Sequence, residues 1–251
     1  MTEQGLAESR QKAQAVIMAG QVYVDGQKVD KAGAPVGESA RIEVRGKTMP
    51  YVSRGGLKLE KAMACWPICL EGAVCADIGA STGGFTDCML QNGAAKVFAV
   101  DVGYNQLDWR LRTHPKVVCM ERTNARYLTV EQIPQPLDFF SVDVSFISLN
   151  LILPALRPLM APGGEGVCLV KPQFEAGKDK VGKKGVVRDP EVHLEVLSQF
   201  LIHAENADFT VKDITFSPIK GPEGNIEYLG HLRAGAGVPY EGDLWELVQR
   251  S

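Results

Sequence analysis

The fold is decided by the stretch Ala76-Asp77-Ile78-Gly79-Ala80-Ser81-Thr82-Gly83-Gly84-Phe85. An apolar run at 72–76 leads into it, a helical pattern at 85–91 follows it, and a second apolar run at 96–100 ends on Asp101. A strand, a glycine-rich turn, a helix and a second strand that ends on a carboxylate are typical of nucleotide-cofactor domains. Glycines let the backbone approach a ligand closely, and the terminal carboxylate can accept hydrogen bonds from ribose hydroxyls.

The spacing of the glycines favours S-adenosylmethionine over a dinucleotide. A dinucleotide fingerprint reads Gly-x-Gly-x-x-Gly, whereas here Ser81 stands between Gly79 and the pair at 83–84. The Asp77 carboxylate suits the ammonium group of S-adenosylmethionine and does not suit a pyrophosphate. A nicotinamide cofactor, or a plain βα turn, remains the alternative at this point. The residues expected at the cofactor are Asp77, Gly79, Ala80, Ser81, Gly83, Gly84, Phe85, Asp101, Val102, Asn124 and Asp143, with Asn124 near the adenine.

Strand and helix patterns alternate along the rest of the chain. The strand patterns lie at 73–77, 96–101, 117–121, 138–143, 165–171, 210–216 and 225–232. The helical patterns lie at 51–66, 84–92, 105–112, 129–132, 149–159 and 190–206, and a short helix at 240–251 would bury Leu244, Trp245 and Val248. The alternation predicts an α/β, Rossmann-like sheet of seven strands with helices on both faces. A short glycine-containing turn precedes the last strand and predicts that it is antiparallel, which is the usual arrangement of S-adenosylmethionine methyltransferases.

Composition excludes several classes of protein. With 251 residues, 45% hydrophobic and 23% charged, the chain has room for one α/β domain and a small appendage. No run of eighteen apolar residues and no signal-peptide core is present. The six cysteines include no Cys-x-x-Cys pair, which favours reduced thiols in a cytosolic protein over disulfides or zinc.

The first fifth of the chain differs from the rest in charge and pattern. Residues 1–61 carry ten Lys and Arg against seven Asp and Glu, whereas the remainder carries 17 against 23. A helical pattern at 7–19 ends at Gly20, and strand patterns follow at 21–24, 27–29 and 41–45 around the turn Asp25-Gly26. This order resembles the S4-type RNA-binding module, here short at its front, and a dimerisation or folding appendage is the alternative. The residues expected to contact RNA are Arg10, Lys12, Lys28, Arg41 and Arg45.

Three later residues carry the chemistry. Strand 138–143 ends on Asp143, strand 165–171 ends on Lys171, and the last strand contains Glu227. Enzymes that methylate base amino groups typically place Asn/Asp-Pro-Pro-aromatic after the fourth strand, and this chain has no prolines there. A base C5 methyltransferase needs a nucleophilic cysteine, but Cys168 lies three residues before Lys171 and so on the opposite strand face. Lysine can accept or steer the proton of a ribose hydroxyl, while carboxylates orient the ammonium groups.

Two further patterns were weighed. Residues 177–184 mimic a phosphate loop, but Lys184 replaces the hydroxyl residue that would hold magnesium, so ATPase activity is disfavoured. A basic loop at Lys183 and Lys184 suits RNA phosphates, and a plain solvated loop is the alternative. The carboxylates have no supporting histidine cluster, so no metal is expected.

Long motifs spread over nearly the whole chain resemble the TlyA/hemolysin A family. They lie at 51–59, 77–86, 101–104, 121–126, 143–149, 170–175 and 221–228. The resemblance implies an S4 module joined to an FtsJ-like domain that methylates ribose 2′-hydroxyls, probed here as cytidine in ribosomal RNA or a ribosomal subunit, with S-adenosylmethionine as the cofactor. The family's Lys-Asp-Lys-Glu set falls on Lys58, Asp143, Lys171 and Glu227.

The expected organisation follows from the patterns and the resemblance together. We expect an S4-like domain at 1–46, a linker at 47–51, a methyltransferase domain at 52–235 and a tail at 236–251. Some members of the family are named hemolysins, yet the sequence has no strongly basic amphipathic helix and indicates no membrane partner. A lytic or purely RNA-binding protein and a nicotinamide-dependent oxidoreductase are the competing functions.

Overall fold

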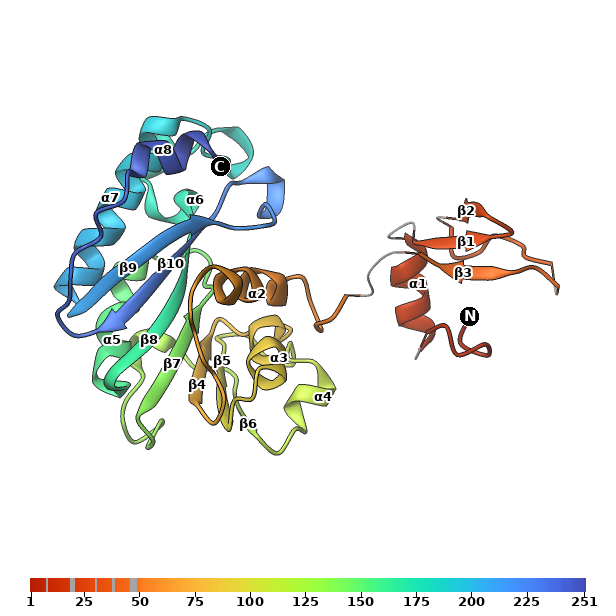
Figure 1. Ribbon diagram of the computed structural model, residues 1–251, viewed down its shortest axis with the longest axis horizontal. Helices are drawn as coiled ribbons and strands as arrows, with labels where there is room; N and C mark the ends of the chain where they lie inside the picture. The colour runs from red at the N-terminus through yellow and green to blue at the C-terminus, as the bar shows by residue number, and fades with distance from the viewer. Residues whose placement is uncertain (8, 19–20, 30, 38, 46–48) are drawn as a thin grey trace. The chain divides into compact units, whose positions relative to one another are not determined.

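The computed structural model describes residues 1–251 except 8, 19–20, 30, 38 and 46–48, and the side chains of a few further residues, Lys12 among them, are also outside the description. The chain forms two compact units, Met1–Pro50 and Tyr51–Ser251, each of which is described by itself (Figure 1). The expected linker at 47–51 falls partly on residues outside the description.

The first unit contains one helix and a small antiparallel sheet. Helix α1 (Arg10–Met18) is followed by β1 (Val22–Val24), β2 (Gln27–Val29) and β3 (Ile42–Val44), with the strand order β2-β1-β3. Asp25 and Gly26 form the tight turn between β1 and β2, both with positive φ, 50° and 81°. Such a turn matches the twist of paired strands and favours Asp-Gly. The helix, hairpin and third strand expected from the sequence are therefore confirmed in this unit.

The second unit is built on a seven-stranded sheet with the order β6-β5-β4-β7-β8-β10-β9. Its strands are β4 (Val74–Ile78), β5 (Lys96–Val100), β6 (Val117–Met120), β7 (Leu137–Val142), β8 (Met160–Val170), β9 (Phe209–Phe216) and β10 (Tyr228–Ala234). Strands β4 to β8 are parallel, and β10 runs antiparallel to both β8 and β9. The predicted seven-stranded α/β sheet with a reversed last strand is confirmed.

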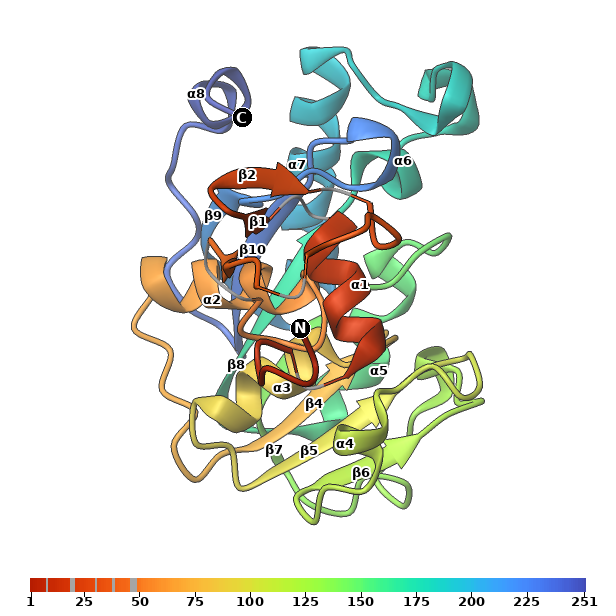
Figure 2. The same cartoon turned by 90° about the vertical axis from the view of Figure 1, so that its right-hand side faces the viewer.

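Helices cover both faces of this sheet (Figures 1 and 2). The helices are α2 (Gly55–Cys65), α3 (Gly84–Gln91), α4 (Trp109–Arg112), α5 (Leu153–Leu156), α6 (Pro172–Glu175), α7 (Pro190–Asn206) and α8 (Leu244–Gln249). Short 3-10 turns are η1 (Ala125–Tyr127), η2 (Leu149–Leu151), η3 (Arg157–Leu159), η4 (Lys178–Lys180), η5 (Lys183–Gly185) and η6 (Pro222–Gly224).

Two hydrophobic layers result from the alternation of side chains along each strand. On β8, Val167 and Leu169 pack in the layer beneath α2 and α3, whereas Cys168 and Val170 pack in the layer beneath α5 and α7. Cys168 is fully buried there, and burial raises the pKa of its thiol well above the usual value. A thiol held protonated in the core cannot act as a nucleophile, which agrees with the exclusion of C5 methylation.

Several predicted helices were wrong in extent. Residues 129–132 form only a turn, because four residues gain too few hydrogen bonds to form a helix without tertiary support. The pattern at 149–159 is broken into η2, α5 and η3, since Pro154 and Pro158 lack a backbone N–H. The helix expected at 105–112 begins only at 109, where Asp108 caps it through the N–H of Arg110.

Smaller corrections concern strand ends and the tail. Strand β8 begins at Met160 rather than 165, and β10 begins at Tyr228 rather than 225. In α8, Val248 is buried as expected, but Trp245 is 44% exposed, so its predicted burial was wrong. A six-residue helix places only one side of its surface against the core, and Trp245 lies outside that side.

Candidate active site

A cavity of about 620 Å³ opens where β4 and β7 lie side by side and their following connections diverge. Ligands bind at this switch point in open α/β sheets, outside the carboxyl ends of the strands. Of the residues expected at the cofactor, those lining the cavity are Asp77, Gly79, Ala80, Ser81, Gly84, Phe85 and Asp143. Gly83, Asp101, Val102 and Asn124 are not among its lining residues.

The cofactor loop is shaped by backbone that only some residues tolerate. Gly79 and Gly83 have positive φ, 83° and 95°, and Ser81 also does, at 49°. A Cβ on Gly79 would lie 2.5 Å from the backbone oxygen of Asp143, so a side chain there would push β7 away from the loop. The N–H groups of Gly79 and Ala80 both donate to the carbonyl of Val100. The loop is thereby fixed against β5 and β7, close to where a ligand would lie.

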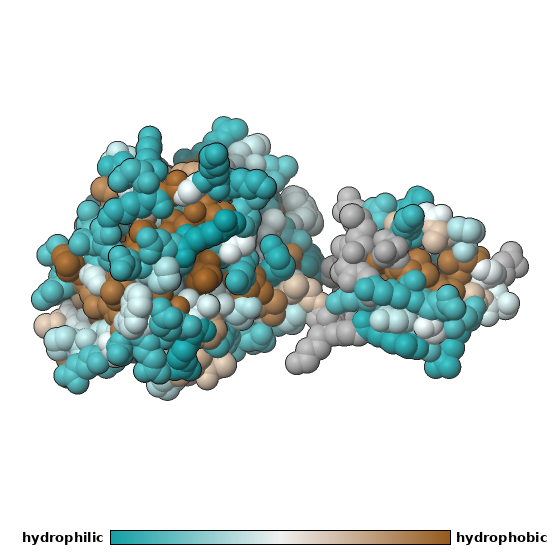
Figure 3. Space-filling view, turned by 90° about the horizontal axis from the view of Figure 1, so that it is seen from above, coloured by the Kyte–Doolittle hydropathy of each residue, from teal (hydrophilic) through white to brown (hydrophobic). Residues whose placement is uncertain are grey.

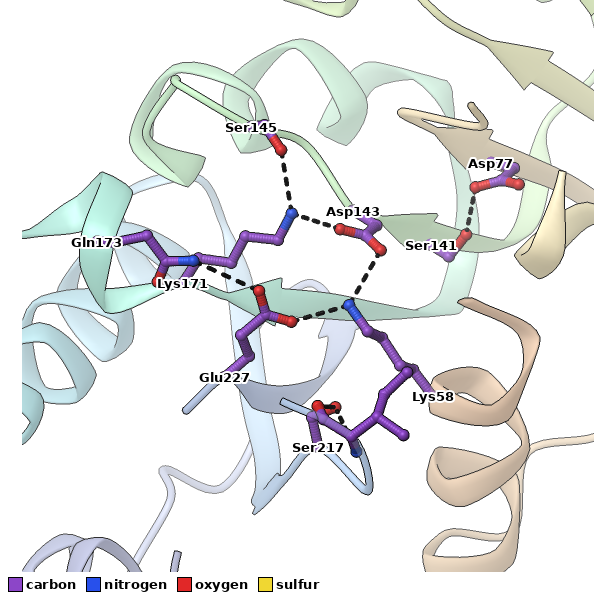
Figure 4. Close-up of polar contacts among 10 residues, drawn as sticks. Lys58, Asp77, Ser141, Asp143, Ser145, Lys171, Gln173, Ser217 and Glu227 are labelled. Carbon is purple, nitrogen blue, oxygen red and sulfur yellow. Dashed lines mark hydrogen bonds and ion pairs between the residues drawn. The ribbon is translucent and has the colours of Figure 1, made fainter. Parts of the chain in front are cut away.

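Asp77 supports the loop from below. Its carboxylate is almost fully buried and accepts hydrogen bonds from the Thr86 N–H at 2.8 Å, the Thr86 hydroxyl at 2.7 Å and the Ser141 hydroxyl at 3.1 Å (Figure 4). Burial raises the pKa of Asp77 to about 6, although these hydrogen bonds act in the opposite direction. Asp77 therefore joins β4 to α3 and to β7, and contact with a cofactor ammonium group would be an additional interaction.

Asp101, Val102 and Asn124 lie further along the same edge of the sheet. The Asp101 carboxylate accepts hydrogen bonds from the N–H groups of Ser81 at 2.8 Å and Gly103 at 2.7 Å. Val102 is an exposed residue, and the Asn124 side chain caps η1 by accepting from the N–H of Arg126. Asp101 thus holds the tip of the glycine-rich loop directly, a link that the sequence pattern did not indicate.

Four charged side chains from different parts of the chain meet at one wall of the cavity. Lys58, on α2, donates to Glu227 at 2.8 Å and to Asp143 at 3.4 Å. Lys171, at the end of β8, contacts the other oxygen of Asp143 at 2.6 Å (Figure 4). Lys58, Lys171 and Glu227 are buried and Asp143 is partly buried. The formal charges balance, so the cluster can be buried without a counterion.

The position of Glu227 depends on the reversed strand. Glu227 directly precedes β10, and because β10 runs antiparallel to β8, its start lies at the edge where β8 ends. The loop before it approaches closely, since a Cβ on Gly221 would collide with the Glu227 carboxylate. Glu227 therefore reaches Lys58 from the opposite side of the cavity to Asp143.

Two residues at the ends of this row of charges were missed by the sequence. The Ser145 hydroxyl accepts from Lys171 at 3.3 Å, and the Gln173 amide donates to Glu227 at 3.4 Å. Their only signal was adjacency in sequence to Asp143 and Lys171. The row thus runs from Ser145 through Lys171, Asp143, Lys58 and Glu227 to Gln173 (Figure 4).

The basic loop expected to contact RNA borders the same cavity. Lys184 lines it with a positive φ of 70°, and Lys183 beside it is exposed. Asn225, also missed by the sequence, holds this loop to the strand of Glu227, because its side chain donates to the Gly185 carbonyl and accepts from the Val187 N–H. No helix continues from the loop as a phosphate loop would require.

The expected RNA-binding residues of the first unit lie in two situations. Arg10 and Lys28 are exposed. Arg41 and Arg45 are exposed as well, but both form ion pairs with Glu43, at 3.0 Å and 2.8 Å. The side chain of Lys12 lies outside the described residues. The charge that this unit offers to RNA is therefore smaller than its count of basic residues suggests.

Two searches of the described residues bear on other functions. None of the helices in the described ranges is both long and apolar enough to cross a membrane. On the face drawn in Figure 3, hydrophobic and hydrophilic residues are interspersed. Among the same residues, no group of three or more His, Cys, Asp or Glu side chains is arranged to hold a metal ion.

Comparison with known proteins defines the family. Residues 51–234 match the FtsJ-like methyltransferase family, and residues 1–42 match the S4 domain. The 16S/23S rRNA (cytidine-2′-O)-methyltransferase TlyA of Mycobacterium tuberculosis is 44% identical over 234 residues, which cover 93% of this chain and 87% of that protein. The chain belongs to the TlyA/hemolysin A family. Hemolysin A of Brachyspira hyodysenteriae is also 44% identical, over 91% of this chain and 95% of its own length.

A solved structure of a TlyA/hemolysin A relative agrees with the fold. A hemolysin-like protein from Streptococcus thermophilus has 47% sequence identity and a TM-score of 0.81, with 99% of this chain and 92% of that chain covered. The family's FtsJ-like domain is that of S-adenosylmethionine-dependent methyltransferases, so S-adenosylmethionine is the cofactor of this class.

The cavity fits this cofactor in size and charge. A volume of about 620 Å³ lies within the range of small-ligand sites. The carboxylates at its wall suit a ligand that carries a sulfonium and an ammonium group, and the glycines of the loop leave its backbone open to contact. The donors and acceptors present are therefore those that S-adenosylmethionine requires.

Proposed function

We propose that this protein methylates the ribose 2′-hydroxyl of a cytidine in ribosomal RNA, with S-adenosylmethionine as the methyl donor. The observation that carries the proposal is the row formed by Lys58, Asp143, Lys171 and Glu227, which lies at one wall of the cavity beside the glycine-rich loop. The relatives named above supply the RNA and the cytidine. The row supplies a reason why the oxygen of a sugar, rather than an atom of a base, would be the acceptor.

The cofactor would be held by the loop at 79–85, with Asp101 fixing the tip of that loop and Asn124 near the adenine. When bound, S-adenosylmethionine supplies an electrophilic methyl group on a positively charged sulfur. The protein must then exclude water from the reacting groups and place the acceptor oxygen in line with that methyl group. The burial of Lys58, Lys171 and Glu227 provides a site with little water.

The two lysines would act on the acceptor hydroxyl. A ribose hydroxyl is a poor nucleophile at neutral pH, so its oxygen must be oriented and its proton must be steered away. Asp143 takes one lysine on each carboxylate oxygen and so fixes both ammonium groups in the wall of the cavity. Lys171 directs two of its three N–H bonds to Asp143 and Ser145, which leaves the third for the acceptor oxygen. Glu227 holds Lys58 from the other side.

Division of the chain into a docking part and a catalytic part completes the proposal. Residues 1–46 would form the S4-like RNA-docking domain, 47–51 the linker, 52–235 the catalytic domain and 236–251 a tail. Exposed cations of the first domain, together with Lys183 and Lys184 at the rim of the cavity, would contact RNA phosphates. Ribosomal RNA, free or in a ribosomal subunit, would place the protein in the cytoplasm.

The experiment is methyl transfer from tritium-labelled S-adenosylmethionine to 16S RNA, 23S RNA and both assembled subunits. Label should appear in one or more of these substrates, and mapping should place it on a cytidine ribose. An RNA with 2′-deoxycytidine at the mapped position should accept no label. Label on a base, or label retained by the deoxy substrate, would contradict ribose methylation.

The competing functions have their own measurements. Calorimetry should detect binding of S-adenosylmethionine and no binding of NAD, because the glycine spacing lacks the dinucleotide pattern. Liposomes loaded with a dye should stay intact with the purified protein. Leakage from them, with no methyl transfer to any RNA, would favour a lytic function instead.

A further inference from the structure

Glu175 lies next to the row of charges without belonging to it. It is the last residue of α6, the one-turn helix that begins directly after Lys171. One carboxylate oxygen accepts from the Ser148 hydroxyl at 2.6 Å, and the other accepts from the Leu149 N–H at 2.8 Å. The two donors lie at the start of η2, where the Ser148 hydroxyl oxygen also accepts from the N–H of Asn150. Glu175 therefore connects the turn after β8 to the loop after β7.

The loop that it holds carries part of the active site. At its other end, the N–H of Asp143 donates to the carbonyl of Ile78, so the sheet fixes that end. Between the two ends lie Ser145, which accepts from Lys171, and Phe146, a residue with a positive φ of 63°. Glu175 and the sheet are thus the two anchors of residues 143–148.

The contacts close into a ring. From Lys171, the backbone of α6 leads to Glu175, whose N–H donates back to the Lys171 carbonyl at 3.2 Å. The Glu175 carboxylate holds Ser148, the loop leads back to Asp143, and Asp143 contacts the Lys171 ammonium group at 2.6 Å. A ring contact between Phe146 and Phe174, with centroids 4.8 Å apart, lies within the same ring of contacts. If Glu175 is removed, the Asp143–Lys171 ion pair must hold the two loops together with only this aromatic contact and the Ser145 hydrogen bond.

The charge of Glu175 has no other use in the structure. Across the described residues, no Lys, Arg or His forms an ion pair with it, and the cavity lining does not include it. Its carboxylate is partly buried and satisfied by the two donors of the loop. A carboxylate that accepts two such bonds at once sets both the distance and the orientation of the segment that donates them.

We propose that Glu175 is a positioning residue for methyl transfer. It fixes the loop at 143–148 against the turn after β8, and so sets the geometry of Lys171 relative to Asp143 and Ser145. The inference rests on the proposed function, because the geometry matters only if these groups act on an acceptor oxygen. Displacement of such groups by about 1 Å can lower a rate by about two orders of magnitude.

The test compares Glu175→Ala with a matched control, Asp243→Ala. The Asp243 carboxylate also accepts two backbone hydrogen bonds at the start of a helix, from Trp245 and Glu246, but it does not line the cavity. We expect kcat for methyl transfer to RNA to fall about 10- to 100-fold in Glu175→Ala, with the Kd for S-adenosylmethionine changed less than about twofold. The control should lose a similar amount of thermal stability and keep its kcat.

Two further variants separate positioning from simple loss of stability. Glu175→Gln keeps an oxygen for the Leu149 N–H and can donate to the Ser148 oxygen, so it should restore most of kcat. Ser148→Ala removes one of the two bonds and should give an intermediate kcat. The double variant Glu175→Ala/Ser148→Ala should be no slower than Glu175→Ala, because both changes break one connection.

Hydrogen exchange on the unliganded protein tests the connection without any RNA. The amides of 144–149 should exchange faster in Glu175→Ala than in the wild type or in Asp243→Ala. If the wild type transfers no methyl group to any RNA, the proposed function fails and the exchange measurement still decides whether Glu175 holds the loop. Unchanged exchange at 144–149, an unchanged kcat in Glu175→Ala, or an equal loss of kcat in the control would overturn the inference.

Discussion

The two sides of the cavity are built in opposite ways. The cofactor side is made from one continuous segment, in which glycines and backbone N–H groups of the β4–α3 loop are held by Asp77 and Asp101. The acceptor side is made from charged side chains that are far apart in sequence, since Lys58 contacts partners 85 and 169 residues away. A continuous segment can adopt its geometry locally, whereas dispersed charges come together only when the whole sheet has formed. Binding of the cofactor and chemistry on the acceptor should therefore be separable by mutation.

The largest effect is expected on the acceptor side. Lys171→Met should lower kcat for methyl transfer by about 10²- to 10⁴-fold, because the acceptor hydroxyl loses the group that orients it and steers its proton. Lys58→Met should act in the same direction. The Kd for S-adenosylmethionine should stay within about twofold in both, measured by calorimetry beside single-turnover tritium transfer.

Lys180→Met is the matched control for these lysines, because Lys180 is paired with Glu195 on the surface. It should leave both kcat and Kd unchanged. A large loss of cofactor affinity in Lys171→Met would mean that the two sides of the cavity are not separable.

Asp77 tests the contact between the sides, because it accepts from Thr86 on α3 and from Ser141 on β7. Its pKa is raised from 3.8 to about 6, chiefly by burial, so between these values the folded protein binds more protons than the unfolded chain. This residue's contribution to the free energy of unfolding should therefore fall by at most about 3 kcal/mol as the pH rises from about 4 to about 6.

Urea unfolding of the wild type and Asp77→Asn at several pH values between 4 and 7 measures this contribution. The wild-type stability minus the Asp77→Asn stability should fall across that window, since the other titrating groups cancel in the difference. A difference that stays flat or rises with pH would show that the ionised carboxylate is not penalised by its burial.

Asp101 tests the cofactor side alone. Asp101→Ala removes the acceptor for the Ser81 and Gly103 N–H groups and the expected partner of the ribose hydroxyls, so cofactor binding should weaken by about 1.5–3 kcal/mol. At saturating S-adenosylmethionine, kcat should be close to that of the wild type. Titration calorimetry with steady-state kinetics measures both quantities, and unchanged affinity would assign the ribose to another residue.

The smallest effect is expected in the first unit, which belongs to neither side of the cavity. Lys28→Ala should lower the dependence of RNA affinity on salt by about one in the slope of log K against log salt, because one phosphate contact is lost. Glu43→Gln should strengthen binding slightly, since it frees Arg41 and Arg45 from their ion pairs.

Lys212→Ala, an exposed lysine on β9, is the control for the salt measurement. It should leave the slope unchanged. An equal change of slope in Lys28→Ala and Lys212→Ala would contradict a docking role for the first unit, whatever its fold.

The sequence by itself determined the alternation of strands and helices, the glycine-rich loop and the family. These features depend on local patterns, namely the spacing of apolar residues and the backbone conformations that glycine permits. Helix extents were predicted less well at 105–112, 129–132 and 149–159, because caps, prolines and tertiary support decide where a short helix begins and ends.

Only the tertiary structure decided how the site is assembled. The reversed direction of β10 places Glu227 at the edge where Lys171 ends β8, and helix α2 brings Lys58 between Glu227 and Asp143. The supporting contacts of Ser145, Gln173, Glu175 and Asn225 depend on loops that meet only in the folded chain. Side-chain contacts across more than eighty residues leave no local pattern in the sequence, since they are fixed by the order and direction of strands in the sheet.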